Sequence, residues 1–504
     1  MNVALPAISD DLDAGLATQQ WVIESYLLML GSLILIGGSL SDLFGRRRVF
    51  GIGVAGFGAT SVLCAVAPTA ELLVAARALQ GIAGALLVPS ALAVIVSTFD
   101  ESERGAAIGS WTAWSGVSAL IGPLLGGVLV EAVSWRLVFA ISLVPVAGAL
   151  YLIAKHVPKD LDSVVHRQVD YAGAILCALG LSGVVLGLIE QPSYGWGDPL
   201  VALPLVLGTA CLVLFILRER RFPDPMLPLE LFRRRNFAAG NLATFAIYGG
   251  LSGAFFFLPI FLQGVAGYSA VKAGLALIPM TVVMFLTAKR FGALADRIGP
   301  RPLMTAGPLI AAVGMALLMR LDADTSYLTD VVPAVLLFGL GMSMVVAPLT
   351  ATVLADADQE HAGVASGVNN AISRVAGLVA IAAVGAVVAA QFSSELDSRV
   401  PDAGRDPALA AAVEDAKARP LRVEGGAAGA ESLRAATEDA SVQAFRVAAL
   451  SSAVLMLLGG LVSAVGMRAP RRSVPCEDCP GGALVGASEE VARARPPELE
   501  PVPG

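Results

Sequence analysis

The stretch Gly38-Ser39-Leu40-Ser41-Asp42-Leu43-Phe44-Gly45-Arg46-Arg47-Arg48 decides the fold, because a version of it occurs twice. The second copy, Gly292-Ala293-Leu294-Ala295-Asp296-Arg297-Ile298-Gly299-Pro300-Arg301, begins about 254 residues later and keeps both glycines, the aspartate and an arginine. Further pairs recur at nearly the same offset: Pro89 with Pro348, Gly105 with Gly363, and Gly109 with Gly367. This constant offset predicts two homologous bundles, an arrangement used by many secondary transporters.

The composition indicates that these bundles lie in a membrane. Of 504 residues, 56% are hydrophobic and 15% are charged, whereas soluble domains carry about 25% charge. The apolar residues form blocks of about 20, the length of a membrane-spanning helix. We predict complete spans near 19–41, 48–67, 71–97, 106–130, 136–154, 171–190, 199–217, 238–263, 273–292, 302–319, 330–354, 363–392 and 443–467.

The repeat also predicts where each bundle begins. The second bundle opens near Phe237, and subtracting the offset places the first opening about 17 residues before Met1. The apolar fragment Met1–Ile8 is too short to cross about 30 Å of hydrocarbon. We therefore expect about 14 helices, with most of the first preceding Met1. The expected divisions are an N-terminal bundle (1–155), two inserted helices (156–236), a C-terminal bundle (237–467) with an extracytoplasmic loop (393–442), and a disordered tail (468–504).

The positions of the basic residues predict the orientation. Lys and Arg collect in one set of alternating loops, and such loops are cytoplasmic. This places the C-terminus in the cytoplasm, whereas the net charge of −7 says little. The five cysteines suggest no disulfide framework. Cys476 and Cys479 have ligand-like spacing but lack a second pair, so no metal site is expected, and their role stays open.

Four stretches carry a further signal: Gly38–Arg48, Leu73–Gly81, the run from Gly116 to Gly127, and Asn2–Pro6. They resemble motifs of the major facilitator superfamily, and in particular those of the fourteen-helix drug:proton antiporters, the QacA/EmrB-like family. The resemblance runs from Met1 to about Gly466. It implies the major facilitator fold in a bacterial cytoplasmic membrane, with a monomer that exchanges substrates for protons.

In such transporters the first of these motifs is thought to latch the cytoplasmic gate. Glycine allows close helix packing, and an aspartate at a helix end can pair with arginines or face a helix N-terminus. The alternative is that the arginines merely follow the positive-inside rule. The expected gate residues are Gly38, Asp42, Gly45, Arg46, Arg47, Arg48, Gly292, Asp296, Gly299 and Arg301.

Two charged residues inside predicted spans are candidates for proton coupling. Arg77 lies about seven residues into its span, where a charge usually marks a functional pathway. Glu24 lies about five residues into its span, and burial favours the protonated form of a carboxyl group. The resemblance implies an acidic residue at this place that serves protons and cationic substrates. The alternatives are a structural arginine bonded to carbonyl groups and a glutamate that faces outside water.

The remaining motif residues predict an exporter. Proline and glycine bend and thin a helix, and the resemblance associates this fifth-helix pattern with export; an ordinary kinked helix is the alternative. The pattern comprises Gly116, Gly122, Pro123, Gly126 and Gly127. Candidates for the substrate cavity are Tyr26, Gln80, Asn369, Asn370 and Arg374, although the asparagines are as well explained by hydrogen bonds between helices.

We therefore expect a secondary transporter that exports small hydrophobic or cationic compounds, such as drugs, antibiotics or toxic metabolites. An uptake permease of the same fold and an exporter of one endogenous metabolite remain alternatives. No G-x4-G-K-[ST], H-E-x-x-H or G-x-S-x-G pattern occurs, so ATP-driven transport and enzymatic activity are disfavoured. No cofactor and no nucleic-acid partner are expected.

Overall fold

In the described part of the chain, every regular element of the computed structural model is a helix. The structure describes residues 1–99, 114, 118, 121–157, 170–223, 225–355, 362–401, 406–423 and 431–467. These residues belong to one unit that ends at Arg468. The expected tail (468–504), with Cys476 and Cys479, lies outside them, as do Gly105, Gly109 and Gly116.

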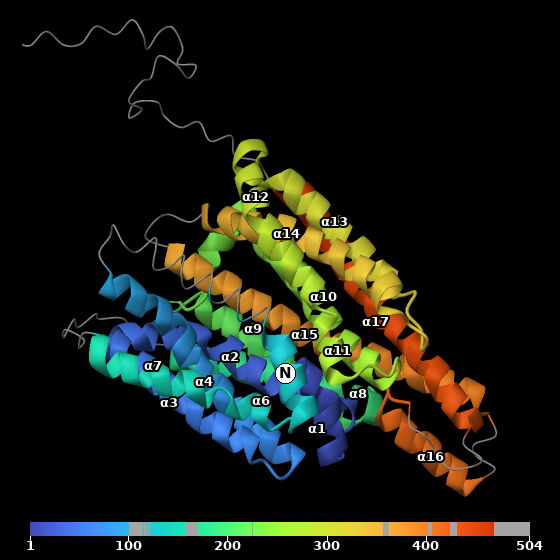
Figure 1. Ribbon diagram of the computed structural model, residues 1–504. Coiled ribbons are helices and arrows are strands. Elements are labelled where there is room, and N and C mark those ends of the chain that lie inside the picture. Colours follow the sequence, from blue (N-terminus) through green and yellow to red (C-terminus); the bar gives the residue numbers. More distant parts are fainter. Residues whose placement is uncertain are drawn as a thin grey trace, which may run out of the picture. The chain divides into compact units, whose positions relative to one another are not determined.

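The first bundle is built from helices of very different lengths (Figure 1). A 3-10 turn, η1 (Asn2–Ala4), precedes them. The helices are α1 (Leu5–Leu12), α2 (Leu16–Phe44), α3 (Arg46–Ala65), α4 (Ala70–Thr98), an unlabelled helix Ile121–Ala132, α6 (Leu137–Ala140) and α7 (Leu143–His156).

The inserted pair and the second bundle follow. The pair consists of α8 (Tyr171–Tyr194) and α9 (Pro199–Glu219). The second bundle comprises α10 (Arg235–Gly264), α11 (Ala270–Leu275), α12 (Ile278–Ile298), α13 (Pro300–Leu318), α14 (Val332–Ala355), α15 (Ala362–Arg399), α16 (Pro407–Ala418) and α17 (Glu431–Gly466). Two short turns complete it, η2 (Leu229–Arg233) and η3 (Tyr327–Val331).

Eleven of the thirteen expected membrane spans are confirmed, all except 19–41 and 106–130. In the described residues, eleven helices are long and apolar enough to cross a membrane, and Ile121–Ala132 is a shorter apolar helix. With 29 residues, α2 has more than the length required, and Glu24 is its only charged residue before Asp42. The chain is therefore an all-α polytopic membrane protein.

The segment 393–442 differs in form from a simple loop. α15 continues to Arg399 and α17 already begins at Glu431, so both helices extend beyond their apolar blocks. Arg399 joins the extensions, because it pairs with Asp439 at 2.6 Å and with Glu395 at 3.6 Å. Between them α16 forms a short amphipathic helix.

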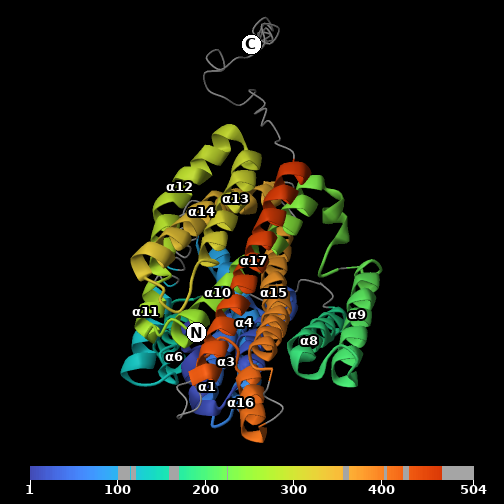
Figure 2. The ribbon, with the colours of Figure 1, turned by 90° about the vertical axis from the view of Figure 1, so that its right-hand side faces the viewer.

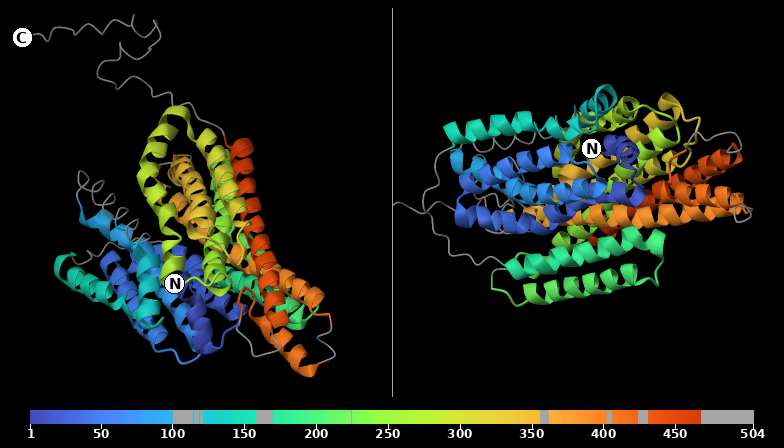
Figure 3. Two further views of the ribbon diagram at one scale, coloured as in Figure 1. Left: turned by 45° about the vertical axis from the view of Figure 1, so that its right-hand side comes forward. Right: turned by 90° about the horizontal axis from the view of Figure 1, so that it is seen from below.

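The inserted pair packs against both bundles. Val185 and Leu181 of α8 form one apolar cluster with Leu28 of α2 and with Leu378 and Ala382 of α15. Figures 2 and 3 show α8 and α9 side by side at the edge of the molecule. Consequently α8 covers the seam where α2 of the first bundle meets α15 of the second.

Candidate functional site

A close contact between α2 and α4 positions the first polar cluster. A Cβ atom on Gly81 would lie 2.4 Å from the Tyr26 carbonyl oxygen, and one on Gly37 would lie 2.0 Å from that of Ala85. Only glycine permits such an approach. The two helices therefore present the side chains of Tyr26, Arg77 and their neighbours at one level of the bundle.

Arg77 is the centre of this cluster. Its guanidinium Nε donates to the Val22 carbonyl oxygen at 2.9 Å, and Nη1 donates to Gln80 Oε1 at 2.5 Å. The guanidinium carbon lies 4.3 Å from the centroid of the Tyr26 ring. Gln80 Nε2 continues the network by donating to Ser61 Oγ at 2.7 Å. Arg77 is thus a cation whose partners are neutral groups on α2 and α4, and Gln80 extends the network to α3.

Glu24 lies in the same part of α2 but belongs to no such network. Its side chain is fully buried, so it does not face outside water. Neither carboxyl oxygen has a hydrogen-bond partner in the described part of the chain. A buried carboxylate without a partner costs several kcal/mol. The neutral, protonated form of the Glu24 carboxyl group is therefore favoured while it is buried, and exposure to water would favour the charged form.

Sequence reasoning missed a second acidic residue near α2. Trp21 Nε1 donates to Glu190 Oε1 of α8 at 3.3 Å. The signal was present, since Glu190 is the only charged residue between Tyr171 and Asp198. The sequence could not predict the contact between Trp21 and Glu190, because it depends on how α8 packs against α2.

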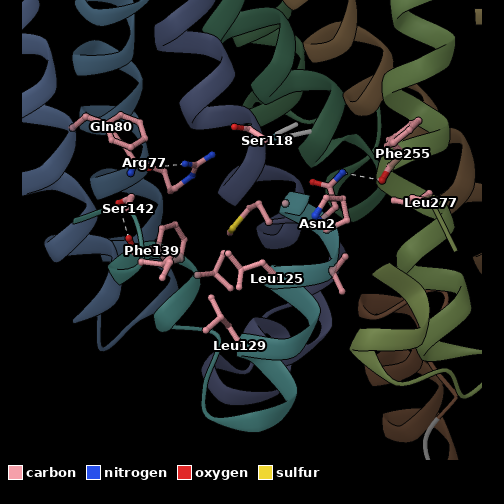
Figure 4. Close-up of a pocket in the computed structure, with 18 residues that line it drawn as sticks. Asn2, Arg77, Gln80, Ser118, Leu125, Leu129, Phe139, Ser142, Phe255 and Leu277 are labelled. Atoms are coloured by element: carbon pink, nitrogen blue, oxygen red, sulfur yellow. Dashed lines mark hydrogen bonds between the residues drawn. The ribbon is translucent and has the colours of Figure 1, made fainter. Parts of the chain in front are cut away.

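A cavity of about 490 Å³ lies beside Arg77 and is bounded by both bundles. Figure 4 shows Arg77 and Gln80 on one side and Phe255 and Leu277 on the other. Most of the wall is apolar. Of the expected site residues, it includes Arg77, Gln80, Gly122, Pro123 and Gly126. It does not include Glu24, Tyr26, Asn369, Asn370 or Arg374.

The fifth-helix motif forms part of this wall and contacts the second bundle. A Cβ atom on Gly127 would lie 2.7 Å from the Ala270 carbonyl oxygen, and one on Gly274 would lie 2.5 Å from that of Pro123. Glu131 Oε2 also accepts a hydrogen bond from the backbone N–H of Val271 at 3.2 Å. Helix Ile121–Ala132 therefore packs backbone to backbone on α11. A Cβ atom on Gly122 or Gly126 would meet no atom within 4 Å in the described part of the chain.

The polar residues of α15 lie in two settings. Asn369 Nδ2 donates to Asn241 Oδ1 at 3.0 Å and to Thr244 Oγ1 at 2.8 Å, both on α10, which supports a role in helix pairing. Asn370 is exposed. Arg374 packs near Gly31 of α2, and its buried Nε has no partner in the described part of the chain.

The repeated motif has the same backbone turn in both bundles. Gly45 separates α2 from α3 with φ +94°, and Gly299 separates α12 from α13 with φ +84°, a region that glycine adopts readily. The side chains of Asp42 and Asp296 lie outside the described part. Arg46 and Arg48 lie at the start of α3, and Gly38 and Gly292 lie within α2 and α12.

The arginines of the two motif copies bind equivalent helix ends. Arg47 Nη2 donates to the Ala154 carbonyl oxygen of α7 at 3.2 Å. Arg301 donates from Nε and Nη2 to the Ala464 carbonyl oxygen of α17, at 2.9 and 2.6 Å. These carbonyls lie in the last turns of their helices, where cations are favourable. The motif thus ties the third helix of each repeat to the last one.

At the opposite end of the helices, ion pairs join the two bundles. Asp13, between α1 and α2, pairs with Arg419 at 2.5 Å, and Asp10 pairs with Arg422. Both arginines follow α16, so these pairs connect the surface helix to the first bundle.

Asp11 makes a third ion pair, within the first bundle. Its Oδ2 accepts from Arg136 Nη1 at 2.5 Å and from Trp135 Nε1 at 3.0 Å. These two hydrogen bonds lower the pKa of Asp11, with the larger effect from Arg136.

Comparison with known proteins identifies the architecture. The family model described as Major Facilitator Superfamily matches residues 1–381. The chain belongs to the major facilitator superfamily. Its members are transporters, not enzymes, which confirms the expectation drawn from the motifs.

Relatives in this superfamily include resistance and export proteins. The puromycin resistance protein pur8 of Streptomyces alboniger is 40% identical over 391 residues, which cover 77% of each chain. The tetracenomycin C resistance and export protein of Streptomyces glaucescens is 36% identical over 432 residues, covering 82% of this chain and 77% of that one. An auto-inhibited POT family peptide transporter has the same fold, with TM-score 0.59, 16% identity and coverage of 94% and 97%.

Proposed function

We propose that this major facilitator protein exports small hydrophobic or cationic compounds across a bacterial cytoplasmic membrane in exchange for protons, acting as a monomer with its C-terminus in the cytoplasm. The observation that carries the proposal is the cavity of about 490 Å³ between the bundles. Its volume is in the usual range for small-molecule sites, about 300–1,000 Å³. The names of the relatives, which include export and resistance, support the direction of transport.

The chemistry of the cavity favours lipophilic substrates. Its wall consists mainly of Phe, Leu, Val and Ile side chains, and Arg77 is its only charged side chain in the described part. Because Tyr26, Val22 and Gln80 already engage that guanidinium, its role is to hold the cluster in shape. Affinity then comes chiefly from buried apolar area, about 25 cal/mol per Å², which tolerates substrates of different shapes.

Glu24 supplies the proton step in this proposal. In the described conformation its carboxyl group is fully buried without a partner, so a proton must be bound for the burial to be tolerated. A conformation that opens α2 to water would allow the proton to leave. Exchange requires the two conformations to differ in their affinity for proton and substrate, and Glu24 provides that difference for the proton.

The test uses proteoliposomes that contain the full chain and an imposed pH gradient. We expect gradient-driven transport of a lipophilic cation such as ethidium, and we expect Glu24→Gln to abolish the response to the gradient. Glu24→Asp keeps the carboxyl group and should restore part of it. Glu190→Gln, the same change at the carboxyl group that accepts a hydrogen bond from Trp21 Nε1, is the control for a general effect of charge. Gradient-dependent transport by Glu24→Gln equal to that of the unmodified chain would refute the role of Glu24.

A further inference from the structure

The inserted helix pair carries a groove that the transport mechanism does not use. The groove has a volume of about 420 Å³ and lies at the end of the pair where α8 begins and α9 ends. The pair packs on the bundles through α8, and only 17% of the α9 span is buried. The groove lining comprises Leu176, Leu214, Leu217, Arg218, Arg221 and Phe222.

Arg218 is held rigidly at one end of this groove. Its Nε donates to both carboxylate oxygens of Asp170, at 2.7 and 3.0 Å, and the Asp170 side chain is fully buried. The guanidinium carbon lies 5.0 Å from the centroid of the Phe222 ring. The Arg218 side chain nevertheless remains 38% exposed. It is therefore a fixed cation with one open side.

Arg221 adds a second cation on the same face. It lies in the turn that follows α9, where its backbone N–H donates to the Arg218 carbonyl oxygen at 2.8 Å, and its exposed side chain lines the same groove as Arg218. Of the nearby carboxylates in the described part of the chain, Asp170 is engaged by Arg218, and Glu219 is buried, where its Oε2 accepts from the N–H of Leu227 at 2.7 Å. The charge of Arg221 is thus not offset by either group.

The apolar part of the groove favours a lipid over a soluble anion. Leu214 and Leu217 are about half exposed on α9, at 52% and 43%. Leu176 lies five residues into α8, which corresponds to about 7.5 Å along the helix axis. That depth matches the upper part of an acyl chain when the helix end lies at the headgroups. A basic site between helices at this level is suited to an anionic headgroup.

We propose that this groove binds one anionic phospholipid, with its phosphate on Arg218 and Arg221 and an acyl chain along Leu176, Leu214 and Leu217. Positive residues at a helix end can also be explained by membrane orientation alone. That explanation predicts equal roles for Arg220 and Arg221. The groove distinguishes them, because Arg221 lines it and Arg220 does not.

The test is native mass spectrometry of the full chain in detergent, titrated with equal amounts of phosphatidylglycerol and phosphatidylcholine. We expect one phosphatidylglycerol to be retained preferentially. Arg221→Gln should weaken its retention about fivefold, the usual effect of one arginine on an anionic lipid. Arg220→Gln, the matched control, should change retention less than twofold. Leu214→Asn should also weaken it, because the acyl chain then meets a polar side chain.

Each other outcome would overturn the proposal. Equal losses in the two arginine variants would indicate an unspecific charge effect, and equal retention of both lipids would exclude headgroup recognition. Displacement by millimolar inorganic phosphate would identify a site for soluble anions. Arg221→Lys guards against misfolding, since it keeps the charge but not the fork of donors and should bind with intermediate strength.

Discussion

Replacing Arg77 with lysine tests whether the polar cluster around Arg77 is stabilised by the geometry of the guanidinium group or by its charge alone. The change keeps the positive charge but removes the fork that reaches the Val22 carbonyl oxygen and Gln80 Oε1 together. Each hydrogen bond to a charged group contributes about 1.5–3 kcal/mol, and the stacking on Tyr26 adds roughly 1–2 kcal/mol. Lysine can replace one of the two bonds. We therefore expect a loss of about 3 kcal/mol in the free energy of unfolding.

The assay is reversible unfolding of the purified protein in mixed micelles, together with transport measurements. Arg136→Lys is the matched control: the Arg136 side chain is 37% exposed in its pair with Asp11, and such pairs contribute less than about 1 kcal/mol. A double-mutant cycle with Gln80→Leu should show a coupling energy of about 1–2 kcal/mol. The reasoning is refuted if Arg77→Lys costs no more than Arg136→Lys, or if the two losses in the cycle are additive.

Three further predictions concern the contact of Gly274 with helix Ile121–Ala132, the ion pair of Asp13 with Arg419, and the pH dependence that Asp11 confers. Gly274→Leu should abolish transport while the protein remains folded, since its side chain would collide with the backbone of helix Ile121–Ala132; normal transport would contradict that contact. Reversing the charge of Asp13 or of Arg419 alone should lower the transport rate about two- to fivefold in an efflux assay. The double variant, in which the two charges are exchanged, should restore the rate. Failure of the double variant to do so would argue against the pair. Arg136 lowers the pKa of Asp11, so Asp11 stabilises the fold at pH above the ordinary aspartate pKa of about 3.9, and this stability is lost as pH falls through the lowered pKa. In Asp11→Asn, the fall of the melting temperature at acid pH should therefore be less steep. An unchanged dependence of the melting temperature on pH would count against the assignment.

Much of the fold is predictable because the bilayer imposes its own period on the sequence. Apolar blocks of about 20 residues indicate the spans, and the constant offset of the repeat indicates two related bundles. The similar φ angles of Gly45 and Gly299 agree with that repeat. The extensions of α15 and α17 escape this logic. Outside the bilayer, helix length is set by local propensity and ion pairs such as Arg399–Asp439 rather than by hydrophobic thickness.

The candidate site is less predictable, because its partners come from different helices. Burial of Arg77 follows from its place in an apolar block, but its contact with the Val22 carbonyl requires the close approach permitted by Gly81. Asn369 shows the reverse case, since a polar residue in a span turned out to pair helices. The contact between Trp21 and Glu190 depends on where the inserted pair docks, which no local pattern encodes.

The position of α8 constrains how this transporter can move. Leu181 and Val185 contact α2 and α15 at the same time, so the inserted pair cannot follow both bundles if they rotate in opposite directions. The contact of α8 with α2 or its contact with α15 must then rearrange in every transport cycle, and the free-energy barrier of that rearrangement contributes to the turnover rate. Added bulk at Ala382 would slow turnover without touching the cavity, Arg77 or Glu24. Substitutions in the inserted helices can thus change the turnover rate without changing the substrate specificity.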